Sequence, residues 1–101
     1  MKVIYSDNAL EQLQNILDFL VHTQEMPPHK AIQIRDQILD RADEILVNIY
    51  MSQKEDYLEH LQVSHRRVVV SHYKIIYTIK EEYILITDIF DTRQDPKKMK
   101  G

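Results

Sequence analysis

The sequence from His65 to Phe90 reads HRRVVVSHYKIIYTIKEEYILITDIF, and the fold class follows from this stretch. It contains three runs that are rich in β-branched and aromatic residues, a composition that is typical of strands. The runs span residues 65–70, 73–80 and 83–90. Only two residues separate each run from the next, and gaps this short favour hairpins. We therefore predict three consecutive antiparallel strands that form a β-meander.

Two helices are expected upstream of the meander. Apolar residues recur every three or four positions over 7–23, after an N-capping residue at Ser6 or Asp7. Two consecutive prolines interrupt this pattern at positions 27 and 28, and proline suits the first turn of a new helix. The same apolar spacing then continues over 28–50. We predict helices at about 7–23 and 28–50, joined as an αα-hairpin.

The remaining segments complete the predicted order. Residues 3–5 form a short β-prone run before the first helix, and residues 97–99 follow a proline as a final turn. Residues 51–64 are mixed and polar, which indicates a connecting loop or a short strand. The order is β-α-α-β-β-β, an α+β fold in which the helical hairpin packs on one face of an antiparallel sheet. We expect residues 1–101 to form a single domain.

The composition excludes many familiar catalytic and binding sites. The 101 residues include no cysteine and a single glycine, Gly101. Disulfides, thiolate nucleophiles and cysteine-containing zinc sites are therefore excluded, as are glycine-rich phosphate and dinucleotide loops. The five histidines show no metal-ligand spacing. We expect no cofactor and no metal, so any chemistry must come from the arginine, lysine, histidine, tyrosine, acidic and hydroxyl side chains.

Charge is distributed unevenly along the chain, whose net charge is −3. Residues 1–60 contain five basic and eleven acidic residues, whereas residues 61–101 contain eight basic and five acidic ones. Overall acidity argues against strong non-specific binding to nucleic acid, although the second portion could present a local basic face. The alternative is two solvated surfaces of opposite sign.

The sequence carries no sign of export or membrane insertion. The acid Asp7 precedes any apolar run that could serve as a signal peptide. No apolar run reaches the roughly 18–20 residues that are needed to span a bilayer. We therefore expect a cytoplasmic protein that does not bind membranes.

Three features together resemble one known superfamily. They are a short strand that ends in serine, two amphipathic helices, and a meander with characteristic motifs. The motifs are the basic start at His65, Arg66 and Arg67, the YKIIY run at 73–77, and the IFDTRQDP exit at 89–96. This pattern resembles the RelE/ParE superfamily of type II toxin–antitoxin toxins, also known as plasmid stabilisation proteins. The resemblance covers nearly the whole chain.

The resemblance implies a toxin that inhibits growth until a cognate antitoxin neutralises it, with the two proteins forming a hetero-oligomer. It leaves the target open. RelE-like members are mRNA interferases, which cleave messenger RNA on the ribosome without a metal, whereas ParE-like members bind DNA gyrase and are not enzymes. A third alternative is a non-toxic binding module of the same fold.

The resemblance also implies candidate catalytic residues. Arg67, Lys74 and Arg93 match basic active-site positions of the RelE-like enzymes. RNA cleavage by the 2′-hydroxyl needs cations around the phosphate, together with a base and an acid, and His65 is a candidate for acid–base chemistry.

Each of these candidates also has a structural interpretation. Arg67 and Lys74 could simply cover solvent-facing sheet positions, and Arg93 could pair with Asp91 or Asp95. Several ribonucleases of the superfamily place a tyrosine or histidine near the C-terminus, and this chain has neither after Phe90. The question of whether the protein is an enzyme therefore stays open at the level of sequence.

Overall fold

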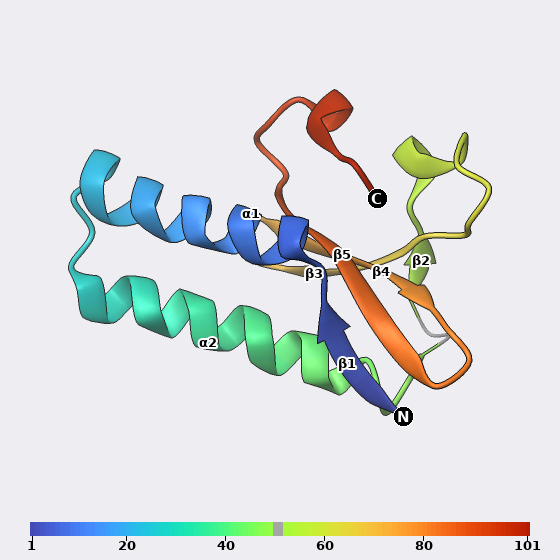
Figure 1. The fold of residues 1–101 in the computed structure, drawn as a ribbon. Coiled ribbons are helices and arrows are strands. Elements are labelled where there is room, and N and C mark those ends of the chain that lie inside the picture. The colour runs from blue at the N-terminus through green and yellow to red at the C-terminus, as the bar shows by residue number, and fades with distance from the viewer. Residues whose placement is uncertain (50–51) are drawn as a thin grey trace.

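The computed structural model describes residues 1–49 and 52–101. Two helices pack on one side of a five-stranded sheet (Figure 1), as the sequence predicts for an α+β fold. The elements are β1 (Lys2–Tyr5), α1 (Asp7–Asp18), α2 (Pro28–Glu44), β2 (Gln53–Lys54), β3 (Arg66–Val70), β4 (Tyr73–Ile79) and β5 (Tyr83–Asp91). Short 3₁₀ turns lie at Asp56–Leu58 and Pro96–Lys98.

The strand order of the sheet is β1-β5-β4-β3-β2. The predicted antiparallel meander of β3, β4 and β5 is confirmed. The expectation of a wholly antiparallel sheet is wrong, because β1 pairs in parallel with β5, from Lys2 opposite Tyr83 to Tyr5 opposite Ile86. The helical hairpin carries the chain away from β1 to the far edge of the sheet. Three antiparallel strands then bring β5 back beside β1 in the same direction.

The first helix has the predicted extent but changes its winding near its C-terminal end, whereas the second helix ends earlier than predicted. The first helix covers the predicted 7–23, but its last turn, Phe19–Thr23, is a wide π-helical turn. The second helix ends at Glu44 rather than near residue 50, and residues 45–47 form turns. Acidic side chains at the C-terminal end of a helix oppose its dipole, and α2 ends in Asp43 and Glu44. Residue 50 itself lies outside the described residues.

The predicted strands are close to the observed ones. The run at 65–70 forms a strand from Arg66 onward, the run at 73–80 ends one residue early, and the run at 83–90 extends to Asp91. The segment predicted as a loop or short strand, 51–64, contains the two-residue strand β2 at its beginning, and residue 51 lies outside the described residues. The final turn begins one residue before the predicted 97–99.

The main core lies between the helices and the face of the sheet that they cover, which we call the inner face. Ile38 and Ala42 of α2 are fully buried there against strand residues such as Ile75 and Ile86. Tyr77 is also fully buried on this face, and its hydroxyl donates to the Ile49 carbonyl oxygen at 2.7 Å. Side chains alternate along each strand, so the opposite, outer face carries Arg67, Val69, Lys74, Ile76 and Phe90.

The Ser6 backbone and two polar side chains of α1 continue the hydrogen bonding of β5 beyond the end of β1. The Ser6 N–H donates to the Ile86 carbonyl oxygen at 2.9 Å. The Asn8 side chain donates to the Thr87 carbonyl oxygen at 3.0 Å, and the Ile89 N–H donates to Gln12 Oε1 at 2.7 Å. These contacts satisfy backbone groups that an unpaired strand edge would leave open.

No helix within residues 1–49 and 52–101 has the length and apolarity needed to cross a bilayer.

We predict that Ile38→Ala lowers the free energy of unfolding by about 2–5 kcal/mol, because it leaves a cavity at a fully buried position. Urea unfolding monitored by circular dichroism measures the change. Ile32→Ala is the matched control on the same helix, since Ile32 is 46% exposed. An equal loss of stability in both variants would contradict the described packing of α2.

Candidate functional site

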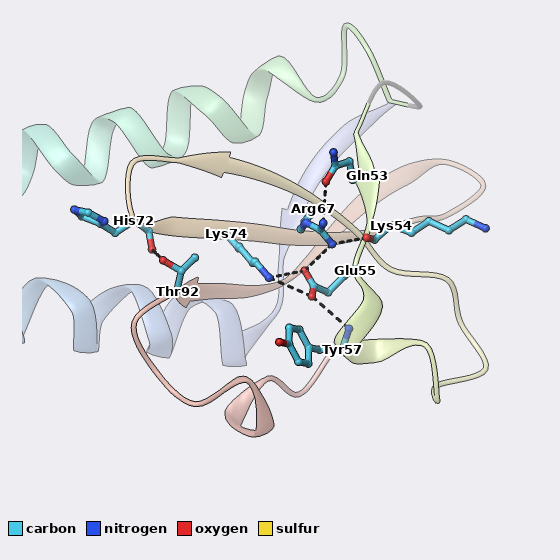
Figure 2. Close-up of polar contacts among 8 residues, drawn as sticks. All are labelled: Gln53, Lys54, Glu55, Tyr57, Arg67, His72, Lys74 and Thr92. Atoms are coloured by element: carbon cyan, nitrogen blue, oxygen red, sulfur yellow. Dashed lines mark hydrogen bonds and ion pairs between the residues drawn. The ribbon is translucent and has the colours of Figure 1, made fainter.

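A buried carboxylate connects two of the predicted site residues on the outer face (Figure 2). The Glu55 side chain has no solvent exposure. Its Oε2 lies 3.5 Å from Arg67 Nη1 and 3.2 Å from Lys74 Nζ, and its Oε1 accepts from Lys74 Nζ at 3.3 Å. Arg67 and Lys74 therefore share one counter-ion, and we call the three residues the Glu55 cluster.

The backbone around Glu55 fixes the direction of its side chain. The Glu55 N–H donates to the His65 carbonyl oxygen at 2.9 Å, which extends the pairing of β2 with β3 by one residue. Glu55 also caps the 3₁₀ turn that follows, because its Oε1 accepts from the Tyr57 N–H at 3.4 Å. The carboxylate is thus held between the turn and the outer face of the sheet.

The guanidinium of Arg67 is bound to three residues of the neighbouring segment. Besides its contact with Glu55, Nη1 donates to the Lys54 carbonyl oxygen and Nη2 donates to Gln53 Oε1 at 2.8 Å. A planar guanidinium with this many partners is held in one orientation. Arg67 therefore lies on the outer face of the sheet and also binds β2 through its guanidinium group.

Lys74 lies between a carboxylate and an aromatic ring. Its Nζ is 5.4 Å from the centre of the Tyr57 ring, in the range of a cation–π interaction. Tyr57 itself is 58% exposed. The outer face therefore presents an accessible aromatic ring beside a lysine whose charge is balanced by Glu55.

Arg93 belongs to a separate ion pair after the end of β5. Its Nε and Nη2 donate to the two Asp91 carboxylate oxygens at 2.9 and 2.8 Å, and its backbone N–H also donates to Asp91 Oδ1. These hydrogen bonds from Arg93 hold the pKa of Asp91 below its ordinary value. Burial, together with the nearby Asp91 charge, raises the pKa of Tyr73. Of the two acids that the sequence offers as partners for Arg93, Asp91 is the one that binds it.

His65 is buried and takes part in packing. Its Nδ1 lies 2.8 Å from the Val63 carbonyl oxygen. Its Nε2 approaches the backbone of Gly101 so closely that a Cβ on that glycine would lie 2.9 Å away. The structure thus brings Arg67 and Lys74 together at Glu55, with Arg93 at Asp91 and His65 beside Gly101.

A second buried carboxylate, Asp88, lies on β5 and is fully buried. Its Oδ2 accepts from Asn8 Nδ2 at 3.3 Å and from Gln12 Nε2 at 3.1 Å. It also accepts from two backbone N–H groups, that of Lys100 at Oδ2 (3.0 Å) and that of Gly101 at Oδ1 (2.8 Å). Asp88 therefore joins the first turns of α1 to residues 100–101.

Sequence reasoning missed the buried carboxylates of Glu55 and Asp88. Glu55 lies in the polar segment 51–64, where no periodicity marks one acid among several as buried. Asp88 offered a usable signal, because it is the single charged residue within the apolar run YILITDIF at 83–90. A charge in such a strand needs buried hydrogen-bond donors.

Within residues 1–49 and 52–101, no group of three or more histidine, cysteine, aspartate or glutamate side chains is arranged to hold a metal ion.

Comparisons with known proteins identify the chain's relatives. The family model described as "ParE toxin of type II toxin-antitoxin system, parDE" matches residues 3–96. Among solved structures, a chain of the chromosomal ParDE toxin–antitoxin system from P. aeruginosa superposes with a TM-score of 0.73. That likeness covers 90% of this chain and 95% of the other at 16% identity, so it supports the fold alone. No curated protein matches the sequence significantly.

We predict that Glu55→Gln lowers the free energy of unfolding by about 1–3 kcal/mol, because it removes the shared counter-ion of Arg67 and Lys74. Urea titration measures the loss. Glu59→Gln is the matched control, since Glu59 is an exposed acid in the same segment. Equal stability of Glu55→Gln and the original chain would contradict a structural role for the carboxylate.

Arg93→Gln is expected to raise the pKa of Asp91 toward its ordinary value of 3.8, because the variant loses the charged hydrogen bonds that lower it. Since the pKa of Asp91 is lowered in the folded state, the pair stabilises the fold above about pH 5, and this stability is lost as the pH falls through the folded pKa. The gain is at most about 1 kcal/mol, because Arg93 is 53% exposed and water screens the pair.

Two measurements test the role of this pair. NMR titration of the Asp91 carboxyl carbon should give a higher pKa in Arg93→Gln than in the original chain. Urea unfolding should distinguish the two proteins at pH 6 but no longer at strongly acid pH. A stability difference that persists unchanged in acid would show that Arg93 acts through packing instead.

Proposed function

The chain belongs to the ParE toxin family of type II toxin–antitoxin systems, and on this basis we propose that it arrests growth until a cognate antitoxin neutralises it. The family match spans residues 3–96, which include both helices, β2 to β5, and β1 from its second residue onward. The proposal therefore concerns the whole fold rather than one motif.

We further propose that the outer face of the sheet contacts the target. The helices already cover the inner face. The outer face carries the Glu55 cluster and two exposed side chains near it, Tyr57 and Val69, of which Val69 lies opposite Lys74 on the neighbouring strand. Accessible aromatic and aliphatic side chains beside charged groups are typical of a protein-binding surface.

The pairing of the basic residues favours DNA gyrase over RNA as the target. Arg67 and Lys74 share the Glu55 carboxylate, and Arg93 pairs with Asp91. A phosphate that gains charge in a cleavage transition state is stabilised by positive charge that is directed at it and not already balanced. All three predicted catalytic cations have acidic partners, and this observation supports a toxin that binds its target without cleaving it.

The Glu55 cluster also supports a second candidate function, the cleavage of RNA. A carboxylate between an arginine and a lysine has the chemistry to accept the proton of a 2′-hydroxyl while the cations contact the phosphate. The Glu55 side chain is fully buried, however, so RNA would have to uncover it first. The leaving 5′-oxygen would still need an acid. The sequence offers His65 for this role, yet its ring is buried and its Nδ1 is close to a backbone carbonyl oxygen.

Controlled expression in bacterial cells tests the proposal. We expect induction of the chain to reduce colony-forming cells and to produce trapped gyrase–DNA complexes, with messenger RNA left intact in primer extension. Replacing Lys74 by Gln should reduce the killing at least about tenfold, because loss of a single contact of roughly 1.4 kcal/mol has that effect on binding.

Arg35→Gln provides the matched control for Lys74→Gln. Arg35 is also paired with an acid, Asp36, but it lies on the exposed surface of α2. If induction of the unchanged chain produces new RNA ends and induction of Lys74→Gln does not, the target is RNA rather than gyrase. Normal growth after induction of the unchanged chain would refute the toxin proposal itself.

A further inference from the structure

Residues 96–101 cover part of the outer face beside the Glu55 cluster. Figure 1 shows this segment, in red, returning from the end of β5 toward the turn that follows β2. Met99 is buried in one apolar cluster with Leu58, Ile76 and Phe90. Ile76 and Phe90 are the cross-strand partners of Arg67 and Lys74. Met99 therefore covers the apolar surface that directly adjoins the two cations.

Asp88 fastens this segment to the sheet from the side of β5. Its carboxylate accepts the backbone N–H groups of Lys100 and Gly101 at 3.0 and 2.8 Å. Because Asp88 is fully buried, these hydrogen bonds form away from competing water. The contact uses backbone groups of the segment, so it depends on where the segment lies and not on its side chains.

The attachment is small and can open without leaving a charge unpaired. Among residues 92–101, all of which the structure describes, Met99 alone is buried. One apolar side chain, the packing of Gly101 against Leu61 and His65, and two hydrogen bonds to Asp88 thus oppose the entropy gained when the segment becomes free. After release, Asp88 still accepts from Asn8 and Gln12, and water reaches its open side.

We propose that residues 96–101 are an autoinhibitory strap, latched by Asp88, that must leave the outer face before a target can contact Ile76 and Phe90. This inference rests on the proposed function, in which the target binds at the outer face. Release would expose apolar side chains beside Arg67 and Lys74, and it would carry three lysines, at positions 97, 98 and 100, away from them. The strap therefore lowers activity while it is closed.

Amide hydrogen exchange measured by NMR tests the latch on the full chain. In the original chain, the N–H groups of Lys100 and Gly101 should exchange at least about tenfold more slowly than in an unstructured peptide. Met99→Ser should abolish this protection within residues 96–101, while circular dichroism keeps the signature of the folded sheet. Lys97→Ser, an exposed position in the same segment, is the control and should keep the protection.

A second variant approaches the latch from the sheet. Asp88→Asn retains the shape of the side chain but removes one acceptor oxygen and the charge, so the exchange of Lys100 and Gly101 should again accelerate. The latch would be overturned if these two N–H groups stayed fully protected in both variants. It would also be overturned if they were unprotected in the original chain.

Growth measurements at graded inducer concentration test the regulatory role. Met99→Ser should arrest growth at an inducer concentration several-fold lower than the original chain requires, and Lys97→Ser should match the original. An unchanged or higher requirement in a Met99→Ser variant with a released segment would overturn autoinhibition. If the original chain does not arrest growth, the proposed function fails. The latch is then judged by hydrogen exchange alone, where faster exchange of Lys100 and Gly101 in Met99→Ser supports it and unchanged protection of both N–H groups refutes it.

Discussion

Strand β5 has to be enclosed on both edges and both faces, and the other elements meet that requirement in different ways. Residues 86–91 are buried without interruption. Strand β4 pairs with one edge, while β1 and then the polar side chains of α1 satisfy the other. The helices cover the inner face, and Met99 covers Phe90 on the outer face. The parallel β1, the position of α1 and the course of the final residues all follow from the same need to remove β5 from water.

The elements that could be predicted from sequence are those whose pattern is local. Helical periodicity identified both helices, and β-branched and aromatic composition identified the three strands of the meander, because each signal depends on neighbouring residues. The pairing of β1 with β5 could not be predicted in this way, since it joins residues such as Lys2 and Tyr83 that are distant in the chain. At the site, Arg67 and Lys74 were found through a family resemblance, whereas Glu55 was not, because burial of one acid in a polar loop is decided by tertiary contacts.

The uneven charge of the chain has a definite structural outcome. Glu55 belongs to the acidic portion of the sequence, yet it lies between Arg67 and Lys74 of the basic portion. The basic surface that the sequence suggested is therefore partly neutralised from within the same molecule. Buried pairs of this kind add little net stability when compared with apolar contacts, but the loss of one partner is costly. The Glu55 cluster thus links the segment that follows β2 to both β3 and β4.

The pairing of β1 with β5 also bears on how the protein is made. Most of the chain must leave the ribosome before Lys2 can meet Tyr83, whereas the helical hairpin can form from local contacts soon after its residues emerge. During synthesis, β1 therefore remains without its partner strand until the last strand is available. A nascent chain that stops short of β5 contains β2, β3 and β4, but it lacks Phe90 of the outer face and the strand that joins β1 to the sheet. The surface that we propose for target contact is thus completed only when β5, with Phe90, has joined the sheet.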